Sequence, residues 1–98
     1  MKTLDYGGSR PGATLIGTGS TDVLPPNEKR LKAEFVNDST QDIYLAKGTP
    51  AALNRGIRLN ANGGSYTIEP DNQGRIWKGS ISAISATGSA NLTWCEDW

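Results

Sequence analysis

The sequence predicts a small all-β protein, an antiparallel β-sandwich or barrel of six to seven short strands. From residue 28 onward, apolar and polar residues alternate in short runs. Clusters of Gly, Asn, Asp or Pro separate these runs at spacings of roughly 8–12 residues. Nowhere do apolar residues recur at helical spacing over any length. A chain of 98 residues is expected to form one domain.

The first 26 residues differ in composition from the rest. They contain five glycines and three prolines mixed with Ser and Thr. Such a stretch loses much backbone entropy on ordering and has few side chains to bury. We therefore expect an extended N-terminal arm or a flexible tail over 1–26, followed by a sandwich domain over 27–98. In an arm laid along a neighbouring subunit, Leu15 and Ile16 would be the apolar anchors.

The domain begins with its clearest strand. Leu31, Ala33 and Phe35 alternate with Lys32 and Glu34, so one face is apolar and the other charged. The further strands are expected at 42–46, 57–59, 66–68, 76–85 (as one strand or two) and 90–94.

Turn residues separate these runs. Asn62-Gly63-Gly64 predicts a hairpin between 57–59 and 66–68, because such residues adopt positive φ at low cost. Residues 70–74 form another expected turn. The apolar phase slips between Ala83 and Ile84, which suggests a bulge or bend.

Most of the core is expected from the alternating apolar residues, which are Leu31, Phe35, Ile43, Leu45, Ile57, Leu59, Tyr66, Ile68, Ile81, Ala83, Leu92 and Trp94.

Charge and hydropathy argue against two classes of partner. The ten basic and ten acidic residues balance, whereas a nucleic-acid-binding protein usually carries a clustered basic excess. The only tight basic group, Lys29, Arg30 and Lys32, is expected on a solvated edge. No apolar run approaches the roughly 18 residues that cross a membrane, and the N-terminus lacks a signal-peptide pattern. We expect neither nucleic acid nor membrane as a partner, and synthesis in the cytoplasm.

The sequence offers little for catalysis. It has no histidine and a single cysteine, Cys95, so no soft-ligand metal site and no histidine-activated nucleophile can form. The carboxylate pairs flank turns or the C-terminus, where they are expected to be solvated: Asp38 and Asp42, Glu69 and Asp71, Glu96 and Asp97. We expect no enzymatic activity, no cofactor and no bound metal.

Aromatic residues supply the candidate contact surface. Trp77 lies out of phase with Ile76 and Trp98 is the last residue; with Tyr44 they are candidates for an interface.

Four segments follow one another in a distinctive order. A basic entry, a strand and an Asn-rich turn occupy Lys29–Ser39, and Asp42–Leu45 leads into Lys47–Ala51. Gly56–Leu59 then runs to Asn62–Ile68, and Ile76–Ser85 precedes a short final strand.

In this order the segment 25–94, about 70% of the 98 residues, resembles small β-structured virion proteins of tailed bacteriophages. The resemblance implies a non-enzymatic protein of the virion, made in the host cytoplasm: a decoration protein, a head or neck component, or the base of a fibre. Its implied partners are further copies of itself, with a trimer as one option, and the major capsid protein or another virion protein.

The alternative hypothesis is a carbohydrate- or receptor-binding β module. Under this hypothesis, Trp77 and Tyr44 would stack on sugar rings beside hydrogen-bonding Asp or Asn side chains.

Overall fold

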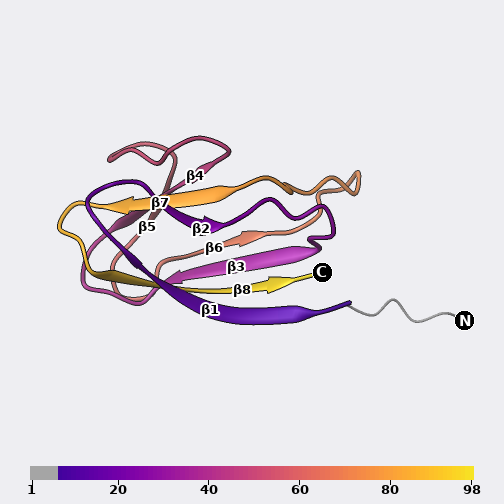
Figure 1. The fold of residues 1–98 in the computed structure, drawn as a ribbon, viewed down its shortest axis with the longest axis horizontal. Coiled ribbons are helices and arrows are strands. Elements are labelled where there is room, and N and C mark those ends of the chain that lie inside the picture. Colours follow the sequence, from indigo (N-terminus) through magenta and orange to yellow (C-terminus); the bar gives the residue numbers. More distant parts are fainter. Residues whose placement is uncertain (1–6) are drawn as a thin grey trace, which may run out of the picture.

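The computed structural model describes residues 7–98, which fold into two four-stranded antiparallel sheets packed as a sandwich (Figure 1). No helix occurs within this range. The strands are β1 (Ser9–Ile16), β2 (Thr21–Leu24), β3 (Lys32–Asn37), β4 (Ile43–Lys47), β5 (Ile57–Leu59), β6 (Ser65–Ile68), β7 (Ile81–Ser85) and β8 (Ala90–Asp97).

The strand order is that of a jelly roll. One sheet has the order β1-β8-β3-β6 and the other β2-β7-β4-β5. Each of the first four strands therefore pairs with one of the last four in reverse order: β1 with β8, β2 with β7, β3 with β6 and β4 with β5. This arrangement is an antiparallel ribbon folded over itself into two layers, and it confirms the predicted antiparallel all-β fold as a sandwich. The expected number of six to seven strands is wrong: there are eight among the described residues, because β1 and β2 lie in the segment expected to be an arm.

The expectation of an arm over 1–26 needs correction for residues 9–24. Strands β1 and β2 lie in opposite sheets of the sandwich, and only residues 1–6 lie outside the described part of the chain. The glycines of β1 have a packing role instead of marking a tail. A Cβ at Gly12 would overlap the Trp94 ring, and one at Gly8 would lie 2.8 Å from the Trp98 ring. Glycine lets each indole cover the neighbouring strand.

Most of the expected core is confirmed. Eight of its members are buried: Phe35, Ile43, Leu45, Leu59, Ile68, Ile81, Ala83 and Leu92. Three more, Ile57, Tyr66 and Trp94, are partly buried and pack against this cluster. The expected core list omitted five members of this cluster, which are Ile16, Val23, Leu24, Ala33 and Ala90.

Leu31 was wrongly expected in the core, since it is 43% exposed. The neighbouring Arg30 is 0% exposed and occupies the interior at this end of the sandwich. The basic group at 29–32 is therefore not a uniformly solvated edge.

The structure corrects two local predictions, the hairpin at residues 62–64 and the bulge between Ala83 and Ile84. Asn62 and Gly63 adopt positive φ, 62° and 114°, yet they join strands of opposite sheets, so the predicted hairpin is wrong. The register of β7 against β4 is continuous from Ile81 to Ser85, with no bulge between Ala83 and Ile84. All five residues of β7 are buried, which explains why its apolar pattern does not alternate.

Candidate functional site

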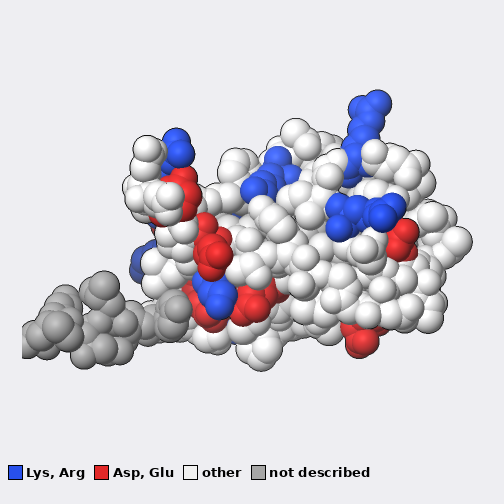
Figure 2. Space-filling view, turned by 180° about the vertical axis from the view of Figure 1, so that it is seen from behind, with Lys and Arg blue, Asp and Glu red and all other residues white. Residues whose placement is uncertain are grey.

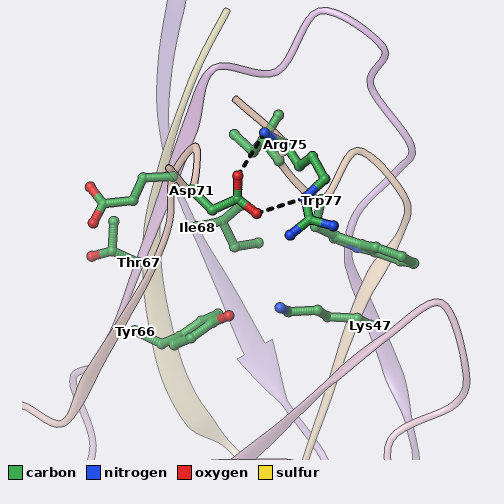
Figure 3. A pocket seen from close by; sticks show the side chains of 9 residues that line it. Lys47, Tyr66, Thr67, Ile68, Asp71, Arg75 and Trp77 are labelled. Atoms are coloured by element: carbon green, nitrogen blue, oxygen red, sulfur yellow. Dashed lines mark hydrogen bonds and ion pairs between the residues drawn. The ribbon is translucent and has the colours of Figure 1, made fainter. Parts of the chain in front are cut away.

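An open pocket of about 380 Å³ lies where the end of β4 meets β6 and the segment that follows it (Figure 3). Its side chains come from both sheets and from the connection between β6 and β7. They are Lys47, Tyr66, Thr67, Ile68, Glu69, Asp71, Arg75, Ile76 and Trp77. The pocket thus combines aromatic rings with ionic groups.

Trp77 forms a fixed wall of this pocket. Its ring lies against Gly48 and Gly79, where added Cβ atoms would come within 3.0 and 2.5 Å of it. Its Nε1–H donates to the Ser80 carbonyl at 3.1 Å. Arg30 Nη1 donates to the backbone carbonyls of Trp77, at 3.2 Å, and Gly79, at 2.8 Å. With 36% of its surface exposed, Trp77 offers an immobilised aromatic face to solvent.

The Arg30 side chain that anchors this wall belongs to a buried ion pair. Its Nε donates to Glu96 Oε2 at 2.7 Å, and its Nη2 donates to the Pro25 carbonyl at 2.9 Å. Glu96 is 3% exposed, so the expectation of a solvated carboxylate is wrong for it. One signal was available: Glu96 continues the inward alternation of Leu92 and Trp94, because β8 extends beyond the predicted end at residue 94.

Asp71 organises the loop above the pocket. Its Oδ1 accepts backbone N–H groups of Gln73, at 2.8 Å, and Arg75, at 3.0 Å, and its Oδ2 accepts Arg75 Nε at 2.9 Å. The backbone hydrogen bonds from Arg75 and Gln73 are the main reason that the pKa of Asp71 is lowered below its ordinary value of 3.8. Gly74, with φ of +77°, closes the predicted turn. The loop therefore holds Arg75 over the pocket (Figure 3).

Lys47 reaches into the pocket from the opposite side. Its ammonium lies 5.3 Å from the centroid of the Tyr66 ring and points toward it in Figure 3. Among the described residues it has no ion-pair partner within 4 Å. Lys47 and Arg75 are balanced by Glu69 and Asp71, so the formal charge of the lining is zero.

The sequence-predicted contact residues do not gather at one place. Trp77 lines the pocket, whereas Tyr44 does not, and its hydroxyl donates to Asn54 Oδ1 at 3.1 Å instead. Trp98 lies beyond the end of β8 with its ring against Gly8. The aromatic partner of Trp77 in the pocket is Tyr66, which the sequence assigned to the core because it alternates with polar neighbours.

The other two predicted residues lie on β1. Ile16 is fully buried in the core of its own chain, whereas Leu15 is 67% exposed. β1 is an edge strand, and its eight residues contrast with four, three and four in the other edge strands, β2, β5 and β6. β2 is further interrupted by a register shift between Asp22 and Leu24. The free edge of β1 is thus the longest that the described chain offers.

The hydrogen-bond pattern shows which groups of β1 are free. Gly8 and Trp98 exchange two backbone hydrogen bonds, at 2.7 and 2.9 Å. Because antiparallel pairs alternate, Ser9, Pro11, Ala13 and Leu15 direct their backbone groups away from β8. Pro11, which has no N–H, falls in this outward set.

Charged groups do not form a single patch on the face drawn in Figure 2. Lys and Arg side chains lie scattered among Asp and Glu, and much of this face is uncharged. Within residues 7–98 there is no cluster of three or more side chains suited to hold a metal ion. The same residues include no helix of sufficient length and apolarity to cross a membrane.

Comparison with known proteins finds no matching family model, no matching curated protein and no matching solved structure.

Proposed function

We propose that this chain is a non-enzymatic structural protein of a phage virion that docks on the capsid or neck as a homo-oligomer. The observation that carries the oligomeric part of the proposal is the free edge of β1. A long open edge is a template for pairing with another chain, and folded proteins usually shorten, interrupt or cover such edges. Among the strands of residues 7–98, the three other edges are short, and β1 alone is left long.

Two further points support a virion role. Jelly rolls occur in viral capsid domains as well as in lectins, an argument by analogy of fold. The order of segments from residue 25 to 94 resembles small phage virion proteins. Many copies on a repeating lattice would add avidity to a weak contact.

The occupant of the β1 edge in this proposal is β1 of a second copy. Antiparallel pairing of a strand with itself is self-complementary, and a twofold axis then relates the copies. It would join two four-stranded sheets into one sheet of eight and bring the exposed Leu15 into the contact region. A trimer would need β1 to pair with a different edge, and those edges are short. A dimer is therefore favoured over a trimer.

The test of assembly is analytical ultracentrifugation at about 100 μM, a concentration that detects contacts of micromolar Kd. Leu15→Lys places a charge beside the edge, and Ala13→Pro removes an outward N–H without touching the bonds to β8. Both variants should sediment as monomers with unchanged circular dichroism. Val36→Lys is the control, since Val36 is 38% exposed on the central strand β3. A monomeric wild-type protein, or edge variants that still associate, would refute the edge contact.

The virion location is tested separately by quantitative mass spectrometry of purified particles of the phage that encodes the chain. A fixed number of copies per particle, from tens to hundreds by analogy with repeating shells, would support the proposal and distinguish shell from neck. Absence of the chain from the particles would refute the virion role, whatever its oligomeric state.

A further inference from the structure

The pocket beside Trp77 has a composition that assembly through β1 does not explain. Aromatic rings, two cations, two carboxylates and the Tyr66 hydroxyl line one open hollow, at a different edge of the sandwich from β1. We propose that this pocket binds a neutral saccharide, a receptor-type function that goes beyond the structural role proposed above.

The first argument is the aromatic wall. Pyranose rings present faces of C–H groups that stack on aromatic rings, and such contacts need an exposed ring face that does not move. Trp77 meets this requirement because its ring rests on Gly48 and Gly79 and its N–H is satisfied by Ser80. Figure 3 places the Tyr66 ring on another side of the same hollow. Little ordering of these groups is needed on binding.

The second argument is the set of polar groups around the rings. Lys47 has no carboxylate partner among the described residues, and Arg75 uses only its Nε on Asp71, which leaves both Nη groups as donors. Glu69 supplies an acceptor, and the Tyr66 hydroxyl can donate or accept, whereas the Thr67 hydroxyl points away from the rings (Figure 3). A sugar hydroxyl also donates and accepts, so it can use both kinds of group at once.

The third argument is charge, which selects a neutral ligand. The two cations of the lining are offset by two carboxylates. A nucleotide or a strongly acidic glycan would need an excess of cations to compensate its charge. The volume of about 380 Å³ lies within the range of small-molecule sites and admits one sugar ring of a longer, solvated chain.

The test begins with the full chain on an array of neutral and acidic glycans that includes bacterial surface polysaccharides. We expect binding to neutral members. The best neutral oligosaccharide is then titrated into ¹⁵N-labelled protein, where three Trp indole N–H signals report separately. The Trp77 indole signal should shift and that of Trp94, which donates to Thr14 Oγ1 at 3.1 Å away from the pocket, should not.

Variants decide whether the pocket is responsible. Lys47→Gln removes a charged donor and should weaken binding about tenfold, and Trp77→Ala should weaken it further. Lys78→Gln is the control, because Lys78 is adjacent to Trp77 in sequence and does not line the pocket. No binding on the array, binding confined to acidic glycans or nucleotides, or equal affinity in Lys47→Gln and wild type would each overturn the proposal.

The saccharide proposal and the assembly proposal can fail independently. The Leu15→Lys variant, made to block the β1 edge, should keep wild-type affinity per subunit for the oligosaccharide. Loss of sugar binding in that variant would refute a site contained within one subunit.

Discussion

The buried ion pair between Arg30 and Glu96 makes a strong prediction about stability. The two side chains are 0% and 4% exposed, and Arg30 Nε lies 2.7 Å from Glu96 Oε2. Glu96→Gln keeps the shape of the side chain and removes its charge. An arginine side chain stays protonated in a protein, so Arg30 would become a buried cation without a buried counter-ion. We expect Glu96→Gln to destabilise the fold strongly.

The magnitude follows from the surroundings of Arg30. Removing one partner of a buried ion pair costs about 3–5 kcal/mol. Arg30 would keep its hydrogen bonds to the carbonyls of Pro25, Trp77 and Gly79, so the lower end, about 3 kcal/mol, applies. A domain of this size has a total stability of about 5–15 kcal/mol. At about 4–8 °C per kcal/mol, the midpoint of thermal unfolding should fall by about 15 °C.

The assay is urea and thermal unfolding followed by circular dichroism, with Glu34→Gln as the matched control. Glu34 lies on β3, its side chain is 51% exposed, and it pairs with Lys32 at 3.3 Å. An exposed pair of this kind contributes little, so the control should change stability by about 0.5 kcal/mol or less. Equal effects of the two substitutions would refute the reasoning that burial makes the Glu96 charge important.

Three further outcomes can be measured on the same protein. Gly12→Ala should lower the stability by about 1–3 kcal/mol in urea unfolding, because its Cβ overlaps the Trp94 ring. Gly19→Ala, with no atom within 4 Å of the added Cβ, should change it by only about 0.5 kcal/mol, and equal losses would contradict the packing argument. Thr14→Val removes the acceptor of the Trp94 indole N–H and should cost about 1 kcal/mol; an unchanged urea midpoint would show that this bond contributes nothing. For Asp71, whose pKa is lowered in the fold, the stabilising contribution is complete above its unfolded pKa near 3.8 and is lost as pH falls through the lower folded value. Its side-chain carboxyl carbon should titrate below 3.8 by NMR, and a midpoint at or above 3.8 would exclude the backbone hydrogen bonds as a stabilising feature.

The antiparallel sandwich and most of its core could be predicted because period-two alternation is a local property. Phe35 and Ala33 face inward on β3 while Glu34 faces solvent, and this pattern can be read without knowing the partner strand. The same logic fails for β7, where both faces are buried and alternation disappears. It also fails at Leu31, because a neighbouring arginine takes the interior position.

Strand β1 could not be predicted because the packing role of its glycines involves residues far away in the sequence. Gly12 is paired with Trp94, and only this pairing shows that the missing side chain makes room for an indole. Asn62 and Gly63 show that a turn can be predicted from sequence while the strands that it joins cannot. Local chemistry set their positive φ, but it carried no information on which sheet the next strand would join.

For the candidate site, the sequence indicated Trp77 by its phase but paired it with Tyr44. The side chains that complete the pocket, Tyr66 and Lys47, come from strands of different sheets, and their approach is a consequence of the jelly-roll connections. The separation of Tyr66 and Lys47 along the sequence therefore does not predict that their side chains lie close together.

The buried Arg30 connects the interior of the sandwich to this pocket. The same guanidinium that pairs with Glu96 on β8 also donates to the carbonyls of Trp77 and Gly79, which flank the exposed ring. A buried charge is a poor means of gaining stability, since an apolar substitute often serves as well. An apolar side chain at position 30 could not hold those two carbonyls. The presence of an arginine at this buried position is therefore better explained by the fixed placement of Trp77 than by stability alone.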